Sequence, residues 1–151
     1  MANPNDRNQN YRNNRGGFSQ SQPHREASEA AVPFPEDYVD FAENLMRTNS
    51  RNITTSKLRN ILSQLMDVYN TEILRTDEHI TQESVVKLQM ARIRIAYEYG
   101  RGERWTKEFI TATNLLPWIK EIGDSREKVL HYIHYLEALV AYHRFFGGRE
   151  N

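Results

Sequence analysis

Three basic residues, Lys87, Arg94 and Arg101, recur at intervals of seven in the apolar stretch 84–104. In a helix, positions seven apart fall on nearly the same side, so these cations would form a line about 21 Å long. Several phosphates of a nucleic acid strand lie within that distance. The spacing therefore favours electrostatic binding to a phosphate backbone, without readout of the bases.

The stretch 84–104 is more basic than the chain as a whole. Its basic residues are Lys87, Arg92, Arg94, Arg101 and Arg104, against the acids Glu98 and Glu103. The full chain has 20 Lys and Arg and 20 Asp and Glu, so its formal net charge is zero. This balance argues against indiscriminate coating of nucleic acid and favours a local basic strip. Glu98 falls on the same strip, so it could instead pair with Arg94 or Arg101.

A second group of cations lies at the start of the preceding predicted helix. Thr54 or Thr55 is the expected N-cap. Lys57 and Arg59 follow in the first turns, and Arg51 lies just ahead. The N-terminus of a helix offers free N–H groups, which beside these cations could hold a phosphate. Ordinary solvated charges explain the same pattern.

The sequence lacks the patterns of enzymes and metal sites. There is no cysteine, which excludes disulfides, thiolate catalysis and thiolate zinc sites. His131 and His134 share a helix with His143, but no HExxH or ExxH pattern accompanies them. Neither a phosphate-binding glycine loop nor a nucleophile elbow occurs. We therefore expect no metal, no cofactor and no catalysis, and predict a binding or scaffolding role.

Hydrophobic periodicity predicts an all-α fold, a compact bundle of about five helices. The expected helices span residues 36–47, 56–74, 82–99, 105–122 and 125–146. Pro117 should kink the fourth helix or split it after Leu115. Gly100 should end the third helix in the left-handed conformation. Asp124 should cap the fifth helix together with Glu127.

The third predicted helix has two apolar sides, separated by the basic strip. One side consists of Val86, Met90, Ile93 and Tyr97, and the other of Leu88, Ile95 and Tyr99. A helix of this kind is expected to pack against neighbours on both sides.

The last predicted helix is apolar nearly all round. Beyond its main stripe it carries Tyr132, Tyr135, Tyr142, Phe145 and Phe146. This excess of aromatic surface has two explanations, which the sequence leaves open. The helix is either a face for a protein partner or the central helix of the core.

The first 32 residues differ in composition from the rest. Residues 1–32 are rich in Asn, Arg, Gln, Ser and Gly without a hydrophobic period. This composition predicts a disordered tail ahead of a single domain over 33–151. No stretch resembles a signal peptide or approaches the roughly 20 apolar residues of a membrane span. We expect a cytoplasmic protein without membrane contact.

Three motifs together carry a family resemblance. They are TTSKLRNIL at 54–62, ARIRIAYEYGR at 91–101 and YLEALVAYHRFFGG at 135–148. In this order and spacing they closely resemble the small subunit of type III-A (Csm) CRISPR interference complexes, over roughly residues 52–148. Tyr99 departs from the pattern, because the family usually has a small residue there.

The resemblance implies an all-helical, non-catalytic subunit stacked head to tail in several copies. Its implied partners are the guide crRNA, the target RNA, further copies of itself, the backbone subunits and the large polymerase-like subunit. The nuclease and cyclase activities of such complexes belong to the other subunits.

The resemblance also implies which residues contact the target strand. They are Lys57 and Arg59 in SKLRN, and Arg92, Arg94 and Arg101 in ARIRIAYEYGR. Charge and spacing add Arg51, Lys87 and Arg104 to this predicted RNA-binding set.

Two other readings come from different functional classes. A free-standing helical homodimeric adaptor would bind a protein partner through its aromatic C-terminal helix and would show no affinity for RNA. A DNA-binding regulator would need a polar recognition helix after a short turn, and the helices here are too apolar for that.

Overall fold

The computed structural model describes residues 32–149, so the predicted tail lies outside the described residues except for Val32. In the described part the chain forms six helices and no named strand. They are α1 (Tyr38–Asn49), α2 (Thr55–Glu72), α3 (Gln82–Arg101), α4 (Arg104–Ala112), α5 (Leu115–Ile122) and α6 (Arg126–Phe145). The predicted all-α fold is confirmed.

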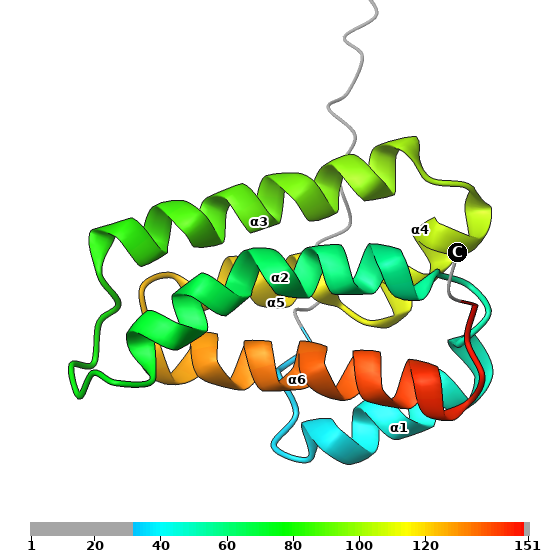
Figure 1. The fold of residues 1–151 in the computed structure, drawn as a ribbon, viewed down its shortest axis with the longest axis horizontal. Coiled ribbons are helices and arrows are strands. Elements are labelled where there is room, and N and C mark those ends of the chain that lie inside the picture. The colour runs from blue at the N-terminus through cyan, green and yellow to red at the C-terminus, as the bar shows by residue number, and fades with distance from the viewer. Residues whose placement is uncertain (1–31, 150–151) are drawn as a thin grey trace, which may run out of the picture. The chain divides into compact units, whose positions relative to one another are not determined.

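Helix α6 is the centre of the arrangement. It packs against α1, α2 and α5, and in Figure 1 it lies between α1 and α2. Helix α3 lies on the far side of α2, where it packs against α2, α4 and α5. Most of the core among residues 32–149 is therefore built around α6.

The aromatic residues of α6 mostly belong to this core. Tyr132 and Tyr135 are buried, and their hydroxyls donate to the carbonyl oxygens of Leu115 and Thr113, both at 2.9 Å. Burial raises the pKa of both phenols, so they remain neutral donors. Of the aromatic set only Phe145 is largely exposed, at 73%. The core explanation of α6 is thus the correct one for most of its length.

The fourth predicted helix is two helices, which raises the count from five to six. The break lies at Thr113 and Asn114, ahead of the expected position after Leu115. Asn114 has φ 53°, a left-handed conformation that asparagine tolerates better than most residues. Pro117 does not cause the break. It is in the first turn of α5, where a missing N–H costs no helical hydrogen bond.

Gly100 does not end α3, contrary to the prediction. The helix continues to Arg101, and Gly102 follows with extended φ −69° and ψ 154°. A Cβ at Gly102 would lie 2.7 Å from the carbonyl oxygen of Glu98 and 2.9 Å from Cβ of Thr106. Glycine is needed here because the Glu98 carbonyl and the Thr106 side chain leave no room for a Cβ.

Asp124 does not cap α6 either. Ser125 is the N-cap and accepts from the Lys128 N–H at 3.3 Å. The Asp124 carbonyl accepts from the Ile80 N–H at 2.9 Å, and its carboxylate lies 3.1 Å from Nδ1 of His79. Asp124 thus joins the α5–α6 loop to the α2–α3 loop.

Glu72, fully buried at the end of α2, links α2 to α3 and α6 through hydrogen bonds. Its Oε1 accepts from Ser84 Oγ at 2.7 Å and from the Thr81 N–H at 3.0 Å. Arg75 Nη1 lies 3.4 Å from Oε2, and Arg126 Nε donates to the Glu72 carbonyl at 2.7 Å. Burial opposes ionisation of this carboxyl, but the hydrogen bonds and Arg75 outweigh it and lower its pKa.

Candidate nucleic-acid interface

Helix α3 shows one of its two apolar sides to solvent. Leu88, Ala91 and Ile95 are buried against the other helices. The outward side, called here the apolar stripe, consists of Val86 (53% exposed), Met90 (58%), Ile93 (61%) and Tyr97 (54%). Within residues 32–149, α3 therefore packs on only one of its two apolar sides, because this helix lies at the edge of the bundle.

The cations spaced by seven lie along one border of the apolar stripe. Lys87, Arg94 and Arg101, the α3 ridge, are each near a carboxylate. Nζ of Lys87 lies 3.1 Å from Glu83 and 3.8 Å from Asp67. A hollow beside the ridge, about 590 Å³ in volume, is lined by Lys87, Arg94 and apolar stripe residues. The positive charge of the ridge is thus partly neutralised.

Glu98 is buried beneath the C-terminal part of the α3 ridge, with 7% of its surface exposed. Its Oε1 lies 3.4 Å from Arg94 Nη2, and its Oε2 lies 3.9 Å from Arg101 Nε. This Oε2 atom has no hydrogen-bond partner among residues 32–149. The alternative that Glu98 pairs with these arginines is confirmed.

Tyr97 lies between the same two arginines. The guanidinium carbons of Arg94 and Arg101 are 5.8 and 5.5 Å from the centre of its ring. Cations and an exposed aromatic face at one place are the elements that single-stranded nucleic acid binders use, the first for phosphates and the second for bases. The end of α3 therefore offers both.

A second hollow, about 300 Å³ in volume, lies where α2 begins and α3 ends. Its cations are Lys57, Arg101 and Arg149, and Trp105 lies at its edge. We call these four residues the basic corner. The structure thus brings together two predicted residues, Lys57 and Arg101, and adds two that the sequence analysis missed.

The basic corner is held together by the end of the chain. His143 is fully buried, with Nε2 2.7 Å from the Ile53 carbonyl oxygen and Nδ1 3.1 Å from Thr55 Oγ1. The Thr55 N–H donates to the carbonyl oxygen of Arg149 at 2.7 Å. Arg149 in turn donates from Nη2 to the carbonyl of Arg51 at 3.3 Å. The segment after α6 therefore closes onto the start of α2.

The other predicted cations lie apart from the basic corner. Arg51 contributes its carbonyl to Arg149, and its own side chain is not part of the lining. Arg59 is exposed on α2, and Arg92 is half-buried on α3. Neither lines the basic corner. The eight predicted residues thus divide between the ridge, the corner and isolated positions.

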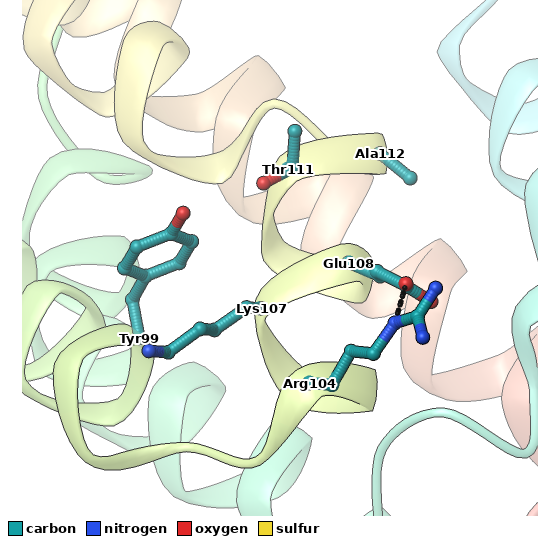
Figure 2. Close-up of a pocket in the computed structure, with 6 residues that line it drawn as sticks. All are labelled: Tyr99, Arg104, Lys107, Glu108, Thr111 and Ala112. Carbon is teal, nitrogen blue, oxygen red and sulfur yellow. Dashed lines mark hydrogen bonds and ion pairs between the residues drawn. The ribbon is translucent and has the colours of Figure 1, made fainter.

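Arg104 lies beside a third hollow, of about 550 Å³, between the end of α3 and α4. Figure 2 shows its guanidinium paired with Glu108, with Nε 2.8 Å from Oε1, while Lys107 extends toward Tyr99. Nζ of Lys107 is 5.8 Å from the centre of the Tyr99 ring. Tyr99 is therefore accommodated beside α4, and no atom would crowd a Cβ at Gly100.

No cluster of three or more metal-ligating side chains occurs among residues 32–149. None of the six helices is both long and apolar enough to cross a bilayer.

Comparison with known proteins identifies the family. The family model described as Csm2 Type III-A matches residues 34–149. The chain belongs to the Csm2 family. It is 35% identical over 126 residues to the Streptococcus thermophilus "CRISPR system Cms protein Csm2", covering 80% of this chain and 99% of that protein.

Two further Csm2 proteins are similar to this chain over most of its length. The Mycobacterium tuberculosis protein of the same name is 30% identical over 119 residues, which is 76% of this chain and 95% of the relative. The protein from Enterococcus italicus is 35% identical over 125 residues, 72% of this chain and 88% of the relative. The resemblance to the small subunit of type III-A CRISPR complexes is confirmed.

Proposed function

We propose that this Csm2-family chain is a non-catalytic subunit that binds the target RNA strand, or the backbone of its duplex with the guide crRNA, through its basic residues. Several copies stack head to tail and contact the backbone and large polymerase-like subunits of the complex. The assembly acts in the cytoplasm, in defence against foreign nucleic acid. The role of each copy is electrostatic, because cations replace the counterions of the target-strand phosphates.

The observation that carries this proposal is the meeting of cations from separate segments. Lys57 comes from α2, Arg101 from α3 and Arg149 from the segment after α6. Arg101 also ends the α3 ridge, so the corner and the ridge form one path. A path of cations with exposed Tyr97 and Trp105 suits a single strand better than a protein partner.

The apolar stripe supports the assembly part of the proposal. Val86, Met90 and Ile93 have no flat ring on which a base could stack, yet each is more than half exposed. Contiguous exposed apolar side chains mark protein contacts. We assign this side of α3 to contact with a neighbouring subunit, and the ridge on its border to the RNA.

The structure disfavours the alternative of an adaptor that binds a protein partner through its C-terminal helix. It rested on excess aromatic surface along the C-terminal helix, and Tyr132 and Tyr135 are buried with satisfied hydroxyls. What remains exposed is Phe145, in contact with half-buried Tyr142 and Phe146. This remnant is small compared with the surface along α3.

RNA binding is tested with the full chain and a fluorescein-labelled single-stranded RNA, by anisotropy over a range of salt concentrations. Arg94→Gln should weaken binding and make the slope of log K against log salt shallower by about 0.7, the effect of one lost phosphate contact. Lys120→Gln, an exposed lysine on α5 outside the ridge and the corner, is the matched control. It should leave the slope unchanged.

Circular dichroism of each variant shows whether the helices are intact. Wild-type chain without affinity for RNA above background at low salt would contradict the proposal. Purification of the tagged chain from its cell provides an independent check. A large particle with short RNAs supports assembly, and an RNA-free monomer or dimer favours the adaptor.

A further inference from the structure

We propose that the basic corner is a subsite for one nucleotide of single-stranded RNA, turned out of its stack. Lys57, Arg101 and Arg149 would hold its phosphate, and Trp105 would receive its base. This inference rests on the proposed function and names the unit that one part of the surface accepts.

The size of the hollow fits one nucleotide. Sites for small molecules have volumes of about 300–1,000 Å³, and the basic corner, at about 300 Å³, is at the lower end. A duplex cannot enter such a hollow, whereas a single unpaired nucleotide can. The corner thus differs in shape from the α3 ridge, with which it shares Arg101, because the corner is a small hollow.

The charge of the corner is less neutralised than that of the ridge. Lys57 is half-buried, and Nζ lies 3.4 Å from the Thr106 hydroxyl, with no carboxylate paired to it among residues 32–149. Arg149 Nη2 donates to a neutral carbonyl, that of Arg51. Glu103 also lines the hollow and opposes an anion, and Arg101 shares buried Glu98 with Arg94, so the positive charge available to an anion comes mainly from Lys57 and Arg149. A bound phosphate would supply the negative charge that these cations lack.

Trp105 has no role in the core that would explain its place. The buried positions of α4 are Thr106, Phe109 and Ile110, whereas Trp105 is 53% exposed. Arg104 lies 5.9 Å from the centre of its ring. An exposed indole beside cations is a stacking platform, and stacking accepts any base because every base has a π-face. The subsite would therefore be independent of sequence.

The fluorescence of Trp105 gives a direct readout. The chain has two tryptophans, and the other, Trp118, is 2% exposed, so an RNA base can reach only Trp105. The full chain is titrated with a single-stranded RNA decamer while emission and acrylamide quenching are recorded. We expect the RNA to quench part of the emission and to shield it from acrylamide. A duplex of the same length should do neither.

Variants separate stacking from charge. Trp105→Ala should lower affinity for the decamer by about tenfold, since it removes one stacked base. Trp105→Phe should keep most of the affinity and lose the fluorescence change. Arg149→Gln should weaken binding and reduce the quenching, with Lys120→Gln again as the control. Urea unfolding confirms that each variant has wild-type stability.

The outcomes distinguish the subsite from the function as a whole. The subsite is wrong if the decamer binds by anisotropy and Arg94→Gln weakens it, while Trp105 emission stays constant and Trp105→Ala binds normally. In that case the RNA uses the ridge alone. If no RNA binds the full chain under any condition, both the subsite and the proposed function fail.

Discussion

Helices α3 and α6 have the same length, 20 residues, and both are apolar on more than one side. Yet α6 is enclosed by α1, α2 and α5, whereas α3 leaves its apolar stripe in solvent. Apolar periodicity thus shows how much of the surface of a helix is stabilised by burial. It does not show whether that surface is buried by the same chain or by another subunit.

The difference between the two helices follows from their polar residues. On α6, Tyr132 and Tyr135 can be buried because carbonyls at the α4–α5 break accept their hydroxyls. On α3, the guanidinium groups of Arg94 and Arg101 would need further partners in a dry interior. Their one buried carboxylate, Glu98, already serves both. The ridge therefore keeps this side of α3 at the surface.

The largest effect should come from removing a core side chain of α6. Leu136→Ala, at a fully buried position, should lower the free energy of unfolding by about 2–5 kcal/mol, because it creates a cavity. Urea unfolding followed by circular dichroism measures this. A loss below about 1 kcal/mol would mean that α6 is not the centre of the fold.

A smaller effect is expected at the joint between α2 and α3. Glu72→Gln should destabilise the fold by about 1–3 kcal/mol, since the buried partners lose a charged acceptor. Because the folded-state pKa of Glu72 lies below its ordinary value of 4.5, ionised Glu72 stabilises the fold above that pH. This stabilisation should be lost as the pH falls from 4.5 through the lowered folded-state pKa.

The pH series also supplies the control for Glu72. The variant should lack this component of the acid dependence, so the stability curves of Glu72→Gln and wild type should converge at low pH. A constant difference between the two curves would contradict the role given to the carboxylate.

The N-caps of the two helices allow a matched comparison. Thr81 caps α3 by accepting from the Ser84 N–H at 3.0 Å, and its hydroxyl also donates to Ser84 Oγ. Ser125 caps α6 at 3.3 Å. Thr81→Ala should cost about 1–2 kcal/mol and Ser125→Ala about 0.5–1 kcal/mol. The reverse order in urea unfolding would show that the Glu72 network does not depend on its cap.

The smallest effect on stability should come from the apolar stripe. Ile93→Ser changes an exposed position, so the free energy of unfolding should shift by no more than about 0.5 kcal/mol. Recovery of the chain with other subunits of the complex should nevertheless fall. A stable variant that assembles normally would show that the stripe is not a subunit contact.

Much of the fold could be predicted because its signals are local. The apolar spacing of α2 and α3, the Thr54 cap and the stop of α6 at Gly147, with φ 73°, all follow from neighbouring residues. The break at Asn114 was missed because Pro117 is the stronger sequence signal, although a proline in the first turn disrupts nothing.

The candidate site was predictable only in part, since it is assembled by tertiary structure. The ridge residues share one helix, so their spacing was enough to place them together. Lys57 and Arg149 are far apart in the sequence, and the contacts of Thr55 with His143 and Arg149 bring them together. Trp105 was given no role, because the sequence does not show that the start of α4 lies beside Lys57 and Arg149.

The central position of α6 has a consequence for biosynthesis. Helices α1 and α2 are translated before α6, but both pack their apolar faces against it. Until α6 emerges, those faces have no native cover, and the contacts that close the core are remote in sequence, which slows folding. Closure of the core should therefore wait until α6 has been translated, with exposed apolar surface for chaperones to bind in the meantime.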